Sequence, residues 1–342
     1  MKDKTFMIVI LLIILAIGTF FAYHYIYIPM TTKLSIPENI PFYSVQYHYR
    51  LEPVSLINFK FGSESVSSFK LSSAIGNDLD NIKEAGFQGI KLEFYFRQNN
   101  YISNRIALKA AQKGLYPIGL LAGHNVKPKD RVFTEEELKE WESFVRQEVR
   151  KNKNRIYYWE VWNEPDIGLF WYGESKDYLI LLKRTYKVIK EENPDAKVIV
   201  TLDAQDKNRS EFSYELLSLG GEDYFDILSF HPYAGHPFIR EDIFNESIIK
   251  EREMLAKYNN KWPLWISEIG QPSSEVGEEE QGRLAEFVFT RTSEEKIPMI
   301  WFFYSDQRAY LLSDGTYGWG LYNQEGNPKP FFERIKSNFL KK

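Results

Sequence analysis

From residue 43 onward, the chain alternates short apolar runs with longer segments whose apolar residues recur at a helical period. The apolar runs predict eight strands, at 43–48, 89–96, 115–121, 156–162, 197–202, 225–230, 263–267 and 298–304. The segments of helical period predict helices at 77–85, 104–113, 134–151, 175–192, 211–219, 245–258, 278–296 and 330–340. This regular alternation predicts an α/β fold, a (β/α)8 TIM barrel, rather than an open doubly wound sheet.

Local signals support several of these boundaries. Thr134 is followed three residues later by Glu137, which is the pattern of a capping box at the start of a helix. Gly86 and Gly114 each end a helical segment just before a predicted strand. Residues 50–72 fit neither pattern and are left open, with an insertion as one interpretation.

The N-terminal region carries a different pattern. Residues 6–28 form an apolar run of 23 residues preceded by Lys2 and Lys4, long enough to cross ~30 Å of hydrocarbon as a helix. The basic flank favours a cytoplasmic N-terminus, so we expect a membrane anchor at 1–28, a proline-containing linker at 29–41 and an extracytoplasmic barrel domain at 42–342. The alternative is a signal peptide cleaved near residues 16–18, which would give a secreted protein.

Composition removes several classes of function. The formal net charge is −4 with no basic tract, which argues against nucleic acid as a partner. The chain has no cysteine, and its five histidines form no closely spaced pair, so we expect no thiol chemistry, no zinc site and no cofactor. Aromatic residues make up 16% of the chain, which suits a site that stacks sugar rings, although most of them are expected in the core.

Two glutamates carry the candidate chemistry. Glu164 lies in Tyr-Trp-Glu-Val-Trp-Asn-Glu-Pro at 158–165, and Glu268 lies in Trp-Pro-Leu-Trp-Ile-Ser-Glu-Ile-Gly at 262–270. Each follows an apolar run, at the carboxyl end of the fourth and the seventh predicted strand. Catalytic groups of barrel enzymes collect at that end, so we expect both carboxylates at one mouth.

These two motifs resemble those of retaining glycoside hydrolases of clan A, which are (β/α)8 barrels, and above all its family 39 and family 5 members. The resemblance implies that Glu164 is the acid/base and Glu268 the nucleophile. Cleavage of an acetal needs a proton on the leaving oxygen and stabilisation of the charge at the anomeric carbon, which two carboxyl groups supply through a covalent intermediate. Their surroundings must therefore keep one carboxyl group protonated and the other ionised.

The resemblance also implies substrate-binding residues. Asn163 matches an asparagine that bonds the sugar 2-hydroxyl, and Tyr233 matches a phenol beside the nucleophile; His231 precedes it at the end of strand six. Trp301 matches a tryptophan floor of the sugar site, although it fits a packed barrel residue as well. Lys91 stands where many members carry arginine, which weakens inference about the substrate. Further residues at predicted strand ends are Tyr47, His48, His124, Asp203 and Gln205.

The expected function is therefore a retaining β-glycosidase with a carbohydrate substrate, held at a membrane by its N-terminal helix. A transglycosidase uses the same covalent intermediate and differs only in its acceptor. A third alternative is a catalytically inactive barrel that binds glycans or serves as an envelope scaffold, since a fold does not determine a function. The sugar, the linkage and the oligomeric state stay open.

Overall fold

The computed structural model describes residues 42–47, 64–123, 132–235, 238–306 and 317–340. The predicted anchor at 1–28 and linker at 29–41 lie outside the described residues. Within the described part of the chain, no helix is both long and apolar enough to cross a membrane.

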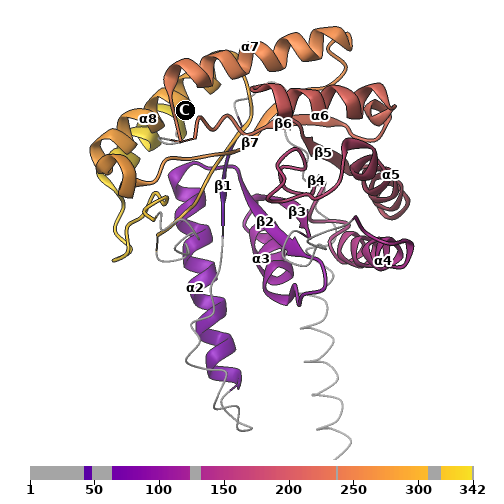
Figure 1. Cartoon of the computed structure of the whole chain (residues 1–342). Helices are drawn as coiled ribbons and strands as arrows, with labels where there is room; N and C mark the ends of the chain where they lie inside the picture. Colours follow the sequence, from indigo (N-terminus) through magenta and orange to yellow (C-terminus); the bar gives the residue numbers. More distant parts are fainter. Residues whose placement is uncertain (1–41, 48–63, 124–131, 236–237, 307–316, 341–342) are drawn as a thin grey trace, which may run out of the picture.

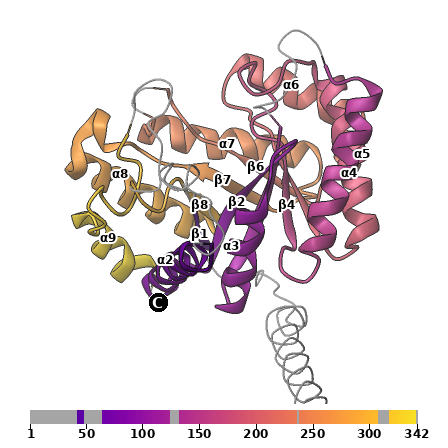
Figure 2. The ribbon, with the colours of Figure 1, turned by 90° about the horizontal axis from the view of Figure 1, so that it is seen from below.

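Eight parallel strands pair in sequence order and close into a barrel, as predicted (Figure 1). Helices surround the strands when the molecule is turned (Figure 2). The strands are β1 (Tyr43–Gln46), β2 (Gly89–Tyr95), β3 (Tyr116–Ala122), β4 (Tyr158–Val161), β5 (Lys197–Thr201), β6 (Ile227–Phe230), β7 (Leu264–Ile269) and β8 (Met299–Trp301).

The outer helices follow the predicted order, with some shifted ends. Thr134 and Glu137 form the predicted capping box, and the helix at 175–192 has the predicted bounds. One helix begins at Glu64, inside the segment that the sequence left open. The helices are α2 (Glu64–Ala85), α3 (Tyr101–Gln112), α4 (Glu135–Lys151), α5 (Ser175–Glu192), α6 (Lys207–Ser218), α7 (Glu241–Lys257), α8 (Ser273–Glu295) and α9 (Pro330–Ile335), which continues as a π-helix at Lys336–Leu340.

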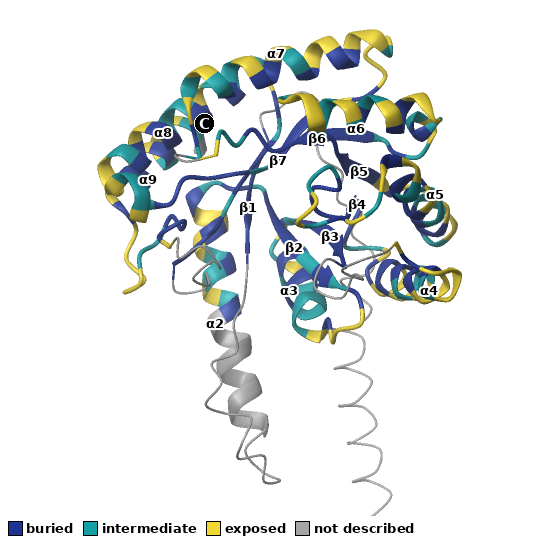
Figure 3. Ribbon diagram, in the orientation of Figure 1, coloured by how far each residue is buried: buried dark blue, intermediate teal, exposed yellow. Residues whose placement is uncertain are grey.

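Side chains inside the barrel form an apolar layer. Successive residues of a strand point to opposite faces, so alternate positions enter the barrel while the others pack against the helices. The strands are buried almost throughout, while the outer faces of the helices are exposed (Figure 3). The inner apolar cluster contains Phe42, Ile118, Ile199, Ile227, Trp265 and Ile300.

A polar layer lies two residues further along several of the same strands. Two positions after an inner apolar residue, the chain has Ser44, Thr201, Ser229 and Ser267, and each is fully buried. Glu160 follows Tyr158, which packs against the inner cluster, at the same spacing. Because these strands run in parallel, the polar residues share one level, which is nearer the carboxyl ends of the strands than the apolar layer.

Candidate active site

Glu164 lies in a sharp turn that follows β4. The backbone is left-handed at Trp162 (φ 66°) and again at Glu164 (φ 41°). This region is unfavourable for residues with a side chain, and for a residue as large as tryptophan it costs on the order of 1–3 kcal/mol. Such a conformation persists only where the surrounding structure holds it, so the packing of Trp162 determines where Glu164 lies.

Trp162 is held by a buried aromatic cluster. Its ring centroid lies 5.5 Å from that of Trp141 and 5.2 Å from that of Trp171, and its Nε1 donates to the carbonyl of Phe170 at 2.9 Å. Gly123 provides the space, because a Cβ there would lie 2.5 Å from the Trp162 ring. The strained turn is therefore fixed from the side opposite the barrel axis.

A hydrogen-bonded chain links Glu164 to the polar layer. Nδ1 of His231 lies 3.1 Å from Oε1 of Glu164, and Nε2 of the same ring lies 2.9 Å from Oγ of Ser267. Ser267 donates to Oε1 of Glu160 at 2.9 Å, and Thr201 donates to the same oxygen at 2.6 Å. All members except Glu164 are fully buried, so the orientation of the Glu164 carboxylate depends on a network sealed from solvent.

Glu268 lies at the end of β7, where the pairing with β8 changes register between Ile266 and Ile269. Such a bulge lets consecutive residues turn toward the same side, which a regular strand does not allow. Ser267 contacts Glu160 inside the barrel, while Oε1 of Glu268 accepts a hydrogen bond from the hydroxyl of Tyr233 at 3.2 Å. The two predicted catalytic glutamates therefore have different partners, His231 and Tyr233, which are two residues apart.

The surroundings separate the pKa values of the two glutamates. Burial raises the pKa of Glu164, but the hydrogen bond and charge of His231, together with the charges of Arg209 and Lys91, outweigh burial and hold the pKa below its usual value. Burial raises the pKa of Glu268 to about 7, against the charges of His231 and Lys91. In the ligand-free site the pKa of Glu268 therefore lies above that of Glu164, the reverse of the order implied by the expected roles.

His231 supplies a positive charge inside the barrel. Burial has the largest single effect on its ring and lowers the pKa, and the negative charge of Glu268 opposes it. Hydrogen bonds to Glu160 and Glu164 act in the same direction, and together they raise the pKa of His231 to about 9. The protonated ring donates from both nitrogens, toward Glu164 and toward Ser267, which fits the two observed contacts.

Lys91 supplies the second cation from β2. Its Nζ lies 2.7 Å from Oε2 of Glu160 and donates to the carbonyl of Ser267 at 3.0 Å, and both members of the ion pair are fully buried. Substrate binding by Lys91 stays a prediction, and its complete burial speaks against it. In the ligand-free site, Lys91 acts through its charge, which lowers the pKa values of Glu160 and Glu268.

A second group of buried charges adjoins Glu164 from outside the barrel. Arg209, in the first turn of α6, lies 2.5 Å from Asp166, 3.3 Å from Asp203 and 3.8 Å from Glu164, measured between charged atoms. Asp203 and Asp166 have fully buried side chains, and burial raises the pKa of Asp203 to about 7. Glu251 of α7 is also fully buried and accepts from the backbone N–H of Ala204 at 2.6 Å.

Trp301 does not lie at the mouth. It is fully buried with its ring centroid 6.0 Å from that of Phe289 in α8, while its neighbour Ile300 belongs to the cluster inside the barrel. Alternation along β8 therefore turns Trp301 outward, and the packed-residue interpretation is the correct one. The next inward position is Phe302, which is partly exposed and packs edge-on against Trp319 at 5.0 Å.

The other predicted residues have mixed outcomes. Asn163 is nearly buried in the turn beside Glu164, with 8% of its surface exposed. The hydroxyl of Tyr47 donates to Asp78 in α2, and Gln205 reaches the carbonyl of His231 at 3.5 Å. His48 and His124 lie outside the described residues.

Sequence reasoning missed two kinds of residue. Glu160, Thr201 and Ser267 are polar residues inside otherwise apolar strands, each two positions after a residue of the inner apolar layer or one packed against it, and that spacing was the available signal. Arg209 and Asp166 lie in a helix and in a loop, where charged residues are common, so no pattern distinguished them.

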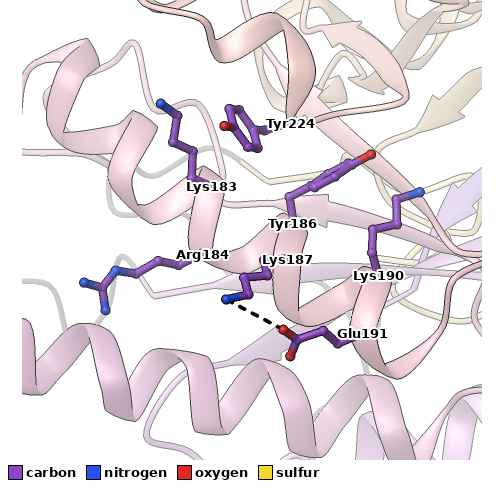
Figure 4. A pocket seen from close by; sticks show the side chains of 7 residues that line it. All are labelled: Lys183, Arg184, Tyr186, Lys187, Lys190, Glu191 and Tyr224. Carbon is purple, nitrogen blue, oxygen red and sulfur yellow. Dashed lines mark ion pairs between the residues drawn. The ribbon is translucent and has the colours of Figure 1, made fainter.

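A groove of about 650 Å3 lies elsewhere, on the outer face of α5 (Figure 4). Its cations largely have local partners: Lys190 pairs with Asp226 at 2.8 Å, and Lys187 lies 3.9 Å from Glu191. The perturbed carboxyl groups lie instead at the strand ends, and we assign the chemistry there. Among the described residues, no cluster of His, Asp or Glu has the geometry to hold a metal ion.

No protein-family model matches the chain. Among solved structures, it is similar to a family 39 glycoside hydrolase from Bacteroides cellulosilyticus (TM-score 0.64, 19% identity, covering 90% of this chain and 65% of that one). It is also similar to a β-glucuronidase from Bacteroides uniformis (TM-score 0.62, 14% identity, covering 89% of this chain and 35% of that one). A third similar structure is xylanase 10B from Thermotoga maritima (TM-score 0.58, 17% identity, covering 88% of this chain and 94% of that one). The chain spans less than two thirds of the first two, and at these identities the likeness establishes the barrel fold.

Proposed function

We propose that this protein is a retaining O-glycoside hydrolase that acts on β-linked sugars, with Glu164 as acid/base and Glu268 as nucleophile. The observation that carries the proposal is the pair of buried carboxyl groups at the ends of β4 and β7, each with its own partner and with separated pKa values. Solved structures of the same fold include several glycosidases, which supports this class of reaction.

In the first step, Glu164 donates a proton to the leaving oxygen while a carboxylate oxygen of Glu268 attacks the anomeric carbon, and the glycosidic C–O bond breaks. In the second step, Glu164 takes a proton from water as the water oxygen attacks the same carbon, and Glu268 leaves as a carboxylate. Tyr233 donates to Glu268, so its hydroxyl is suited to orient the nucleophile.

The first step needs the proton on Glu164 and the charge on Glu268, whereas the ligand-free site favours the opposite placement. Both arrangements contain one proton, so they belong to one macroscopic protonation state of the coupled pair. A bound glycoside, whose leaving oxygen accepts a hydrogen bond from Glu164, favours the reactive arrangement. The activity should therefore have a bell-shaped pH dependence. Its basic limb should lie near 7, where the pair loses its single proton, and its acid limb at lower pH, where the pair takes up a second proton.

The test is covalent labelling with mechanism-based 2-fluoroglycosides, followed by mass mapping of the labelled peptide. A panel of β-glycosyl fluorides of different sugars is needed, because single hydroxyls distinguish the substrates. Label on Glu268, absent in Glu268→Gln and unchanged in the exposed control Glu279→Gln, supports the proposal. Label on another residue, or none with any sugar, refutes it; transfer to an added alcohol in place of water identifies a transglycosidase.

The proposal extends to location. The apolar run at 6–28 with its basic flank supports an N-terminal anchor that holds the barrel outside the cytoplasm. Fractionation of the producing cells tests this: an anchored chain stays in the membrane fraction through alkaline carbonate washing. A shortened chain in the medium, with a new N-terminus near residue 18, would instead establish a cleaved signal peptide.

A further inference from the structure

Arg209 is fixed in place by the structure around it. Asp206 caps α6 by accepting from the backbone N–H groups of Asn208 and Arg209, which sets the direction in which the Arg209 side chain leaves the helix. The guanidinium then runs inward, and only 11% of the side chain is exposed. A long, flexible side chain loses considerable conformational entropy in such a position, so the contacts that it makes must compensate.

Two carboxylates hold two of the three nitrogens of the guanidinium. Nε lies 2.5 Å from Oδ2 of Asp166, and Nη1 lies 3.3 Å from Oδ2 of Asp203. Asp203 is itself oriented by the backbone N–H of Gln205 at 2.6 Å. Because the guanidinium is planar and rigid, these contacts leave Nη2 with a fixed direction.

That third nitrogen is directed at the proposed acid/base. Nη2 lies 3.8 Å from Oε1 of Glu164, the oxygen that also contacts His231. Among the described residues, no atom accepts a hydrogen bond from Nη2, although it is buried. A distance of 3.8 Å is too long for a hydrogen bond but short enough for a strong interaction between charges in a buried site.

We propose that Arg209, clamped by Asp166 and Asp203, is a positioning residue that holds the Glu164 carboxylate for its step as a general base. The inference rests on the proposed function, in which Glu164 must accept a proton from water after the covalent intermediate has formed. A guanidinium at this distance favours the charged carboxylate and fixes the direction of its oxygens. His231 supplies the contact from the barrel side, so the carboxylate is held by cations from two sides.

Several other groups act on Glu164 and must be counted. Lys91 of β2 and His231 after β6 add positive charge, whereas Glu268 of β7 and Asp166 in the loop after β4 add negative charge. The negative charge of Asp203 partly offsets the positive charge of Arg209. Glu251 of α7 also interacts with Arg209, and burial raises the pKa of Glu251 well above its usual value. The test must therefore measure Glu164 itself rather than infer it from overall activity.

The direct measurement is the carboxyl 13C resonance of Glu164 as a function of pH, in protein labelled at the glutamate side-chain carboxyl carbon and assigned by its loss in Glu164→Gln. In Arg209→Met, Glu164 should titrate at least about one pH unit higher than in wild type. Arg209→Lys, which keeps the charge without the fork, should give a smaller rise. Arg252→Met removes an exposed arginine paired with Glu295 and should change nothing.

Arg209→Lys keeps the test decisive if Arg209→Met does not fold, because it retains a positive charge beside Asp166 and Asp203. A titration of Glu164 in Arg209→Met or Arg209→Lys that stays within about 0.3 pH units of wild type overturns the inference.

Kinetics provide a second readout and separate this inference from the proposed function. With an aryl glycoside that has a very good leaving group, breakdown of the intermediate limits turnover, so Arg209→Met should lower kcat more than it lowers kcat/KM. Added azide, which needs no base, should restore kcat. Absence of fluoroglycoside labelling in wild type would refute the proposed function, whereas the carboxyl titration tests the Arg209 contact regardless of that result.

Discussion

Replacing Lys91 by methionine tests the electrostatic design of the barrel interior. The substitution keeps the length of the side chain and removes the charge that lies 2.7 Å from Oε2 of Glu160. Glu160 then retains the donors Thr201 and Ser267 on its other oxygen, but its charge stays in a fully buried position. Removing one partner of a buried ion pair costs about 3 to 5 kcal/mol of unfolding free energy.

The pKa of Glu160 gives a second route to the magnitude. Burial raises it, but the charge of Lys91 and the contacts with His231 outweigh burial, and the pKa falls from 4.5 to about 2. A difference of this size corresponds to about 3 kcal/mol of stability at neutral pH. A carboxyl group with a lowered pKa stabilises the fold above its usual value of 4.5 and loses that contribution as the pH falls toward 2.

Urea unfolding followed by tryptophan fluorescence at pH 7 and pH 4 measures the effect. Lys91→Met should lower the unfolding free energy by about 3 to 5 kcal/mol at pH 7 and by less at pH 4, where Glu160 can take up a proton. The double variant Lys91→Met, Glu160→Gln should be less destabilised than Lys91→Met alone. Lys190→Met breaks the half-exposed pair with Asp226 and should cost about 1 kcal/mol or less.

Two results would refute this reasoning. One is a cost below about 1 kcal/mol for Lys91→Met at pH 7, which would mean that water or a rearranged donor replaces the lysine. The other is additivity of the two substitutions in the double variant, since residues in one ion pair must show coupling.

Two further predictions concern the residues around the mouth. Trp301→Phe should lower the unfolding free energy by about 1 to 3 kcal/mol and leave KM for aryl glycosides unchanged, because Trp301 packs against Phe289 and does not face the site; a raised KM without loss of stability would contradict this placement. Tyr233→Phe removes the donor to Glu268 and so raises the pKa of that carboxyl group, which should lower kcat and move the basic limb of the kcat/KM profile to higher pH; a basic limb that stays in place would show that the hydroxyl does not act on the nucleophile.

Periodicity predicted the barrel because each element had a strong local signal. All eight predicted strands overlap observed ones, and α5 has the predicted bounds, since apolar alternation and capping residues act within one segment. The predicted ends of the elements were less accurate than the elements themselves. The eighth strand was predicted over 298–304, but only Met299–Trp301 pairs as a strand.

Sequence patterns predicted only those residues of the candidate site that follow the end of a strand. Glu164, Glu268, His231 and Tyr233 come together because parallel strands end at one level. The sequence placed Trp301 on the wrong face of β8. A shift of one position along a strand moves a side chain to the opposite face, and nothing in the sequence fixes that register. The contact of Arg209 with Glu164 joins a helix to a loop 45 positions earlier in the chain, and no local pattern encodes such a pairing.

The ion pair that stabilises the barrel also influences the proton at the candidate nucleophile. Lys91 lowers the pKa of Glu268 and Glu160 raises it, so the two members of the pair act on Glu268 in opposite directions. Lys91→Met alone leaves the negative charge of Glu160, which should raise the pKa of Glu268 and move the basic limb to higher pH along with the loss of stability. Changing both residues removes both charges, so stability and the basic limb should recover together. Barrel stability and the protonation of Glu268 would then have one electrostatic origin, the buried pair of Lys91 and Glu160.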